Sequence, residues 1–234
     1  MQHPNPRIPH PPSRLPRWRV PWWYFLWSLC YAWMGLWYRY RCWCPNRVPR
    51  HGPVLLVSNH QSFLDPILVG LGVRRPFFAL ARSGLFDNAL FGWLIRSLNA
   101  ISVRQGAGDK SAMKTCIEVL RQGRTLLIFP EGARTLDGRA QPFNPGTMLM
   151  IRRARPLVVP VAIEGAFHAW PRNKARPHPF GRIYVQYGPP VAAETLIAMG
   201  PEAALLHLYD QVETMRLELS ARMAGSKPPG SGIK

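Results

Sequence analysis

The sequence predicts an α/β fold: a single domain with a largely parallel or mixed sheet flanked by helices, plus an N-terminal membrane-associating helical segment. Three observations predict it. Short apolar runs of strand length alternate with segments of helical periodicity. Polar motifs follow two of those apolar runs directly. A Trp-rich run without charged residues precedes them all, in a chain of 234 residues, which is enough for one domain and an appendage.

The N-terminal segment is first basic and then aromatic. Residues 1–19 are rich in Pro and Arg with little to bury, so we expect a disordered basic tail there. Residues 20–38 carry no charge and hold five Trp, and we expect a membrane-anchoring helical segment over 20–44. The run is about long enough to cross a bilayer core. Its Trp and Tyr content and its flanking Arg suit a helix lying in the headgroup region equally well, so both arrangements stay open.

The rest of the chain alternates between strand and helix patterns. We assign residues 45–224 to one domain and residues 225–234 to a flexible tail. Strands are expected near 53–58, 76–80, 100–104, 124–129, 157–163 and 182–187. Helices are expected near 65–72, 87–98, 109–122, 145–154 and 201–223.

Individual patterns support these elements. The runs PVLLVS (53–58) and RTLLIF (124–129) are almost wholly apolar, which is typical of strands buried on both faces. The helix near 109–122 has Asp109 as its cap and Gly123 just after its end. Its apolar residues recur at helical spacing, at Met113, Cys116, Ile117 and Leu120.

The first polar motif, His60-Gln61-Ser62-Phe63-Leu64-Asp65, leaves the strand at 53–58. Sheets of this class place functional groups at such strand ends. His60 offers a base, and Asp65 offers a carboxylate that can orient it. Asp65 also precedes Pro66 at the start of an apolar run, so its alternative role is only that of a helix N-cap.

The second polar motif, Phe129-Pro130-Glu131-Gly132-Ala133-Arg134, leaves the strand at 124–129, and a further strand ends in Arg104. A solvated surface turn is the simplest interpretation of the second motif alone. Two polar motifs that each follow a strand favour a shared crevice. A base beside a hydroxyl and a cation for a phosphate are what acyl transfer to a phosphate-bearing alcohol requires.

With these residues the chain resembles the 1-acyl-glycerol-3-phosphate acyltransferase family of glycerolipid acyltransferases. Four blocks are recognisable in the family's order: NHQSFLD at 59–65, the stretch from Phe91 to Arg104, FPEGAR at 129–134, and VVPVAI at 158–163. The resemblance covers roughly residues 45–190. Ala133 stands where the family usually has Thr, which bears on the head group more than on the chemistry.

The resemblance implies residue roles and substrates. It implies that His60 is the catalytic base with Asp65 as its partner, and that the acceptor is bound by Arg104, by Glu131 with Gly132, and by Arg134. The implied donor is acyl-CoA or an acyl carrier protein. The implied acceptor is a lysophospholipid, by default 1-acyl-glycerol-3-phosphate. No cofactor is expected, and the expected location is the cytoplasmic face of the inner or plasma membrane.

The residues also bear on mechanism. The chain has no GxSxG motif and no Cys near His60, so we predict direct transfer without an acyl-enzyme. Neutral imidazole, with an ordinary pKa of about 6.5, suits the role of base. No metal is expected, because no metal-ligand spacing occurs among Cys30, Cys42, Cys44 and Cys116.

The charge is strongly basic, with 30 Lys and Arg against 12 Asp and Glu, and a formal net charge of +18. Such a chain meets either nucleic acid or an anionic membrane, and the aromatic N-terminus favours membrane, so no nucleic acid is expected. Two alternatives remain: an acyltransferase for another lyso-lipid, and a non-catalytic basic protein that binds anionic lipid or nucleic acid. The order of the four blocks favours an enzyme, because a charged patch alone does not need it.

Overall fold

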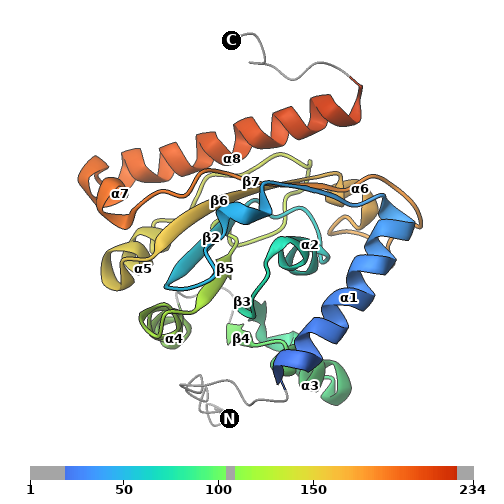
Figure 1. Cartoon of the computed structure of the whole chain (residues 1–234), viewed down its shortest axis with the longest axis horizontal. Coiled ribbons are helices and arrows are strands. Elements are labelled where there is room, and N and C mark those ends of the chain that lie inside the picture. Colours follow the sequence, from blue (N-terminus) through green and yellow to red (C-terminus); the bar gives the residue numbers. More distant parts are fainter. Residues whose placement is uncertain (1–18, 104–108, 226–234) are drawn as a thin grey trace.

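The computed structural model describes residues 19–103 and 109–225. These residues form one seven-stranded sheet, with strands β1 (Arg41–Trp43), β2 (Val54–Ser58), β3 (Phe77–Arg82), β4 (Ala100–Val103), β5 (Thr125–Ile128), β6 (Leu157–Glu164) and β7 (Tyr184–Tyr187). The strand order is β1-β7-β6-β2-β5-β3-β4. Figure 1 labels the strands from β7 to β4 in this order. β6 and β7 are antiparallel, and the other pairs within the described residues are parallel. The predicted α/β domain with a largely parallel, mixed sheet is confirmed.

Helices cover both faces of the sheet because its central strands are apolar on both sides. The helices are α1 (Arg19–Tyr38), α2 (Asp65–Gly72), α3 (Ala89–Ser97), α4 (Lys110–Arg121), α5 (Gly146–Ala154), α6 (Ala166–Ala169), α7 (Ala193–Met199) and α8 (Pro201–Met223), with 3₁₀ turns η1 (Pro45–Arg47) and η2 (Ser83–Phe86). In β2, Leu55 and Val57 pack with α4, α5, α7 and α8. Val54 and Leu56 point to the other face and pack with α1, α2 and α6.

Most expected elements are present, and the differences are local. Asp109 caps α4 as predicted, because its carboxylate accepts from the backbone N–H groups of Ser111 and Ala112, both at 3.1 Å. The N-cap role weighed for Asp65 is wrong. α2 begins at Asp65 itself, with Leu64 in the cap position, and the Asp65 carboxylate turns back toward the preceding loop. The elements that the sequence did not predict are short, chiefly β1, α6 and α7.

The aromatic N-terminal segment is a helix, and its end is built into the domain. Met34 and Tyr38 are buried in the core between α1 and the sheet. β1 follows and pairs with β7, so residues 20–44 do not stand apart from the domain expected to begin at residue 45. Among the described residues, no helix combines the length and the apolarity needed to cross a membrane. Membrane association of this segment stays a prediction.

Aromatic side chains tie the C-terminal half of α2 to its surroundings by donating hydrogen bonds to its backbone carbonyls. Trp27 of α1 donates its indole N–H to the carbonyl of Leu71 at 3.1 Å. Tyr40 donates its hydroxyl to the carbonyl of Leu68 at 2.8 Å, and Tyr187 donates to the next carbonyl along. These bonds matter for the site because α2 carries Asp65 at its other end.

Candidate active site

The two polar motifs meet at one edge of the sheet. β2 and β5 are parallel neighbours, so the segments that follow them emerge on the same side, as the sequence predicted. Asn59 fixes the first segment to β6: its side-chain amide donates to the carbonyl of Ile163 at 2.9 Å, and its oxygen accepts from the N–H of Ile163 at 2.8 Å. The backbone that leads into His60 is therefore held against β6.

His60 and Asp65 form a close pair. The distance between His60 Nδ1 and Asp65 Oδ2 is 2.7 Å, and the side chain of Asp65 is fully buried while that of His60 is 20% exposed. The same carboxylate oxygen accepts from the backbone N–H of Gln61 at 2.6 Å and of Ser62 at 2.7 Å. The carboxylate therefore holds the ring through Nδ1, so Nε2 is the nitrogen that can act as a base.

The His60 ring is also held flat against an aromatic ring. Phe129 stacks on it with centroids 4.0 Å apart and planes 15° apart. Because Phe129 is the first residue of the second motif, each motif supplies one constraint on the imidazole. Sequence reasoning treated Phe129 only as the end of a strand, and its packing on His60 was missed.

Backbone hydrogen bonds join the second motif to His60. Glu131 accepts from the N–H of His60 at 3.0 Å, and Thr135 donates its N–H to the His60 carbonyl at 2.8 Å. Gly132 closes the intervening turn with φ of +73°, a conformation that favours glycine. Burial raises the pKa of Glu131 to about 8, although the N–H groups of His60 and Gln141 oppose the shift. Burial therefore favours the neutral form of Glu131 more than water does.

Arg134 is a cation without a carboxylate partner among the described residues. Its guanidinium lies over the Phe63 ring, 3.4 Å from the centroid, and its Nη1 is buried without a hydrogen-bond partner in the described part of the chain. Burial and then the charge of Arg172 lower the pKa of Arg134, while Asp65 acts in the opposite direction. Within residues 19–103 and 109–225, Arg134 thus forms no ion pair with a carboxylate, although the charge of Asp65 lies close enough to act on it. Arg172 was missed because it lies in a loop that reads as ordinary polar surface.

The structure brings five of the six predicted site residues together: His60, Asp65, Glu131, Gly132 and Arg134. Arg104 lies outside the described residues. The strand before it, β4, runs parallel to β3, and β3 runs parallel to β5, so β4 ends at the same edge of the sheet as the two motifs.

The side chains of Gln61 and Ser62 hold this loop in place through hydrogen bonds to later segments of the chain. Gln61 donates its side-chain amide to the Gly138 carbonyl at 2.8 Å and reaches Glu164 at 3.3 Å, and Glu164 pairs with Arg216 of α8 at 2.9 Å. Ser62 donates its hydroxyl to the Trp170 carbonyl at 3.0 Å. These two polar residues stand between two apolar runs of the sequence. That position was the sequence signal for their role, and sequence reasoning missed it.

The arrangement suits proton transfer more than covalent catalysis. The hydroxyl of Ser62 is engaged with Trp170, and the hydroxyl of Ser58 donates to the carbonyl of Asn59 at 3.1 Å. Neither serine is presented to Nε2 of His60. A base held by a buried carboxylate, with cations close by, can accept a proton from a bound hydroxyl whose molecule also carries negative charge.

Comparison with known proteins adds a family and relatives. A family model described as Acyltransferase matches residues 40–164. The chain is similar to a chloroplastic 1-acyl-sn-glycerol-3-phosphate acyltransferase of Arabidopsis thaliana, with 31% identity over 48% of this chain and 32% of the relative. It is also similar to a lyso-ornithine lipid O-acyltransferase of Pseudomonas aeruginosa, with 35% identity over 50% of this chain and 45% of that protein.

A solved structure extends the similarity to nearly the whole chain. The crystal structure of the 1-acyl-sn-glycerophosphate acyltransferase PlsC from Thermotoga maritima matches with a TM-score of 0.73 and 25% identity, over 90% of this chain and 86% of that one. By contrast, the matched stretch spans only about a third to just under a half of the curated relatives compared above.

Proposed function

This chain belongs to the Acyltransferase family, and from that premise we propose that it transfers an acyl chain from an acyl thioester to the free hydroxyl of a lysophospholipid. The observation that carries the proposal is the 2.7 Å contact between His60 Nδ1 and the buried carboxylate of Asp65, beside the unpaired cation of Arg134. The donor is acyl-CoA or an acyl carrier protein, and the acceptor is 1-acyl-glycerol-3-phosphate, which gives phosphatidate. No cofactor takes part in this scheme.

The chemistry needs one base and no covalent intermediate. Nε2 of His60 takes the proton of the acceptor hydroxyl while its oxygen attacks the thioester carbonyl carbon. The new C–O bond forms, the C–S bond breaks, and the departing thiolate receives the proton from the imidazolium. Asp65 stabilises the imidazolium in between, because its charge lies against the opposite ring nitrogen.

The unpaired cations support a phosphate-bearing acceptor. Arg134 offers positive charge near the base, Arg172 is near enough to act on Arg134, and Arg104 is proposed to add to this charge. Glu131 holds the His60 backbone through its N–H, so its part in acceptor binding is proposed to be that of a neutral acid. A second candidate acceptor is lyso-ornithine lipid, which the name of the 35% identical relative favours.

We place the enzyme at the cytoplasmic face of the inner or plasma membrane, where acyl thioesters of CoA and of carrier proteins are found. Large apolar side chains of α1 and α3 are exposed and support an anionic membrane as a partner; they include Phe25, Leu29, Leu36, Leu90, Phe91 and Trp93. The two helices form one surface, because Trp22 donates its indole N–H to Ser97 Oγ at 3.1 Å and its ring lies 6.2 Å from that of Trp93.

An acceptor and donor panel tests the function. Purified protein in detergent is supplied with acyl-CoA or acyl carrier protein and with lysophosphatidate, lysophosphatidylcholine or lyso-ornithine lipid, and products are identified by mass. We expect phosphatidate as the main product. Acylated ornithine lipid alone would reassign the acceptor. Absence of product with every lyso-lipid and both donors would overturn the proposal.

Replacement of Arg134 tests the anion site. Arg134→Ala is expected to raise the KM for lysophosphatidate by roughly 10- to 150-fold, which corresponds to about 1.5–3 kcal/mol for a charge-assisted contact. Arg134→Lys should recover only part of the loss because it lacks the planar fork. Arg139→Ala, an exposed arginine in the same loop, is the matched control and should leave KM unchanged. Equal KM values for Arg134→Ala and the control would move the phosphate site elsewhere.

A further inference from the structure

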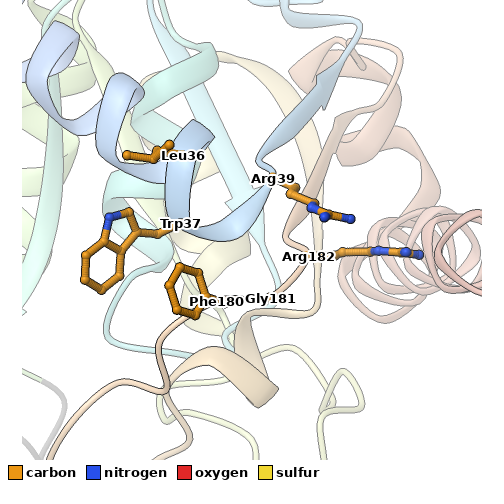
Figure 2. A pocket seen from close by; sticks show the side chains of 6 residues that line it. All are labelled: Leu36, Trp37, Arg39, Phe180, Gly181 and Arg182. Carbon is orange, nitrogen blue, oxygen red and sulfur yellow. The ribbon is translucent and has the colours of Figure 1, made fainter.

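Two arginines outside the proposed active site share a hollow at the end of α1. Arg39 directly follows α1, and Arg182 lies two residues before β7. Both line a cavity of about 400 Å³ together with Leu36, Trp37, Phe180 and Gly181. Figure 2 shows the two guanidinium groups extending in the same direction, away from the rings of Trp37 and Phe180. The hollow therefore has a cationic side and an apolar side.

Backbone hydrogen bonds fix the two walls of the hollow relative to each other. The N–H of Gly181 donates to the carbonyl of Trp37 at 3.2 Å, and the N–H of Ile183 donates to the carbonyl of Tyr38 at 3.0 Å. The Tyr38 hydroxyl donates to the carbonyl of His178 at 2.8 Å. Because Tyr38 is only 1% exposed, these bonds attach the loop that carries Phe180 and Arg182 to the core.

Two residues of the hollow have a backbone conformation that non-glycine residues rarely adopt. Arg39 has φ of 44° and Phe180 has φ of 64°. Such conformations cost free energy and persist where the surrounding structure enforces them. Phe180 stacks on Trp37, with ring centroids 5.4 Å apart, and the residue is 69% exposed. Exposure of this phenylalanine ring to water is unfavourable, so an apolar ligand that covers it would be stabilised.

The charges of the hollow are not compensated by the described part of the chain. Neither Arg39 nor Arg182 forms an ion pair with a carboxylate of residues 19–103 or 109–225. Arg182 is oriented by donating from Nη1 to the carbonyl of Met223, the last residue of α8, at 2.9 Å. Two guanidinium groups beside one cavity attract an anion that both can bind, and the planar guanidinium matches phosphate oxygens.

We propose that this hollow binds the phosphate of an anionic phospholipid headgroup at the membrane surface. Arg39 and Arg182 contact the phosphate, while Leu36, Trp37 and Phe180 enter the acyl layer beside it. Trp and Arg occupy these two depths in membrane interfaces. Leu36 is 78% exposed and gains most from removal from water. The inference rests on the membrane association in the proposed function and adds a defined lipid site to it.

A soluble phosphate would use the cations but not the apolar residues. The exposed rings and Leu36 lie in the same hollow as the arginines, so a ligand with a phosphate next to hydrocarbon fits both sides of the hollow. This combination favours a lipid in a bilayer over a free anion.

Vesicle binding tests the site with the full chain. Arg39→Gln/Arg182→Gln is compared with Arg50→Gln/Arg152→Gln, which removes the same charge from two other exposed positions. With vesicles of phosphatidylcholine containing phosphatidylglycerol, the first double variant is expected to lose on the order of 30-fold in partition coefficient, about five-fold for each cation. The control is expected to lose clearly less, and both should partition alike into pure phosphatidylcholine. Equal losses in the two double variants would show that binding depends on charge spread over the whole surface. That result would overturn the proposed lipid site.

Two further measurements separate the remaining explanations. Titration with inorganic phosphate checks for a soluble-anion site: phosphate binding that the Arg39→Gln/Arg182→Gln variant loses, with unchanged vesicle binding, would overturn the lipid assignment. Acyl transfer in detergent micelles should be the same in both double variants, because neither alters the proposed active site. If wild-type protein showed no transfer while the vesicle result held, only the proposed function would fail.

Discussion

Replacing His60 with alanine is expected to lower the rate of acyl transfer by about 10²–10⁴-fold, the usual contribution of a positioned base. In the proposed mechanism, Nε2 of His60 accepts the hydroxyl proton, and Asp65 and Phe129 hold its ring in place. The hydroxyl of the acceptor is a poor nucleophile without it. The effect should fall on kcat, measured with saturating donor and acceptor in detergent, because the cations that are proposed to hold the acceptor remain.

A histidine elsewhere provides the control. His51 is exposed and lies before β2, and β2 runs from there toward His60 at its other end. His51→Ala should therefore keep the wild-type rate. Both variants should melt close to the wild-type temperature, since the His60 side chain is partly exposed and its backbone bonds are unchanged. Near-normal turnover by His60→Ala would remove the proposed mechanism.

Replacing Asp65 with asparagine is the second large effect, with an expected loss of about 10²–10⁴-fold in kcat. An amide oxygen in the place of Oδ2 can still accept from His60, Gln61 and Ser62, but it carries no charge to stabilise the imidazolium. The amide nitrogen would then occupy the place of Oδ1, which is buried without a hydrogen-bond partner among the described residues. If the amide turned the other way, it would donate to Nδ1 and leave Nε2 protonated and unable to act as a base.

A series of three variants separates chemistry from folding. Asp65→Asn should reduce activity with a small change in melting temperature. Asp65→Ala should reduce both, because two buried N–H groups lose their acceptor, at about 1–3 kcal/mol for each unsatisfied group. Asp210→Asn, an exposed carboxylate on α8, should change neither. Wild-type activity in Asp65→Asn would show that the carboxylate serves only the loop.

Much of the fold could be predicted because single patterns determine it. The apolar run from Val54 to Val57 has neither a polar face nor a helical period, and it proves to be buried on both sides. The cap at Asp109 rests on a local hydrogen bond that the next residues always offer. β1 was missed because three residues, Arg41 to Trp43, carry too little pattern, and their pairing with β7 is decided by contacts far along the chain.

The site could be predicted in part for the same reason. His60 and Asp65 are close in sequence, so their pairing is a local matter. The stacking of Phe129 on His60 joins residues that are distant in sequence, and no spacing rule signals it. The same is true of the effect of the Arg172 charge on Arg134. The capping role of Asp65 was a reasonable local alternative, and it lost because the loop before α2 offers two N–H groups and a ring nitrogen to the same oxygen.

The bonds between aromatic side chains and the end of α2 have a mechanical consequence. α2 has eight residues and is therefore about 12 Å long, with Asp65 at its start and the partners of Trp27 and Tyr40 near its end. α2 therefore fixes the position of the base relative to α1. In the proposed arrangement with α1 at the lipid surface, α2 would set the height of His60 above the acyl layer. The hydroxyl of the proposed lipid acceptor would then have to rise to the histidine, and acceptors would differ in how readily they reach that level.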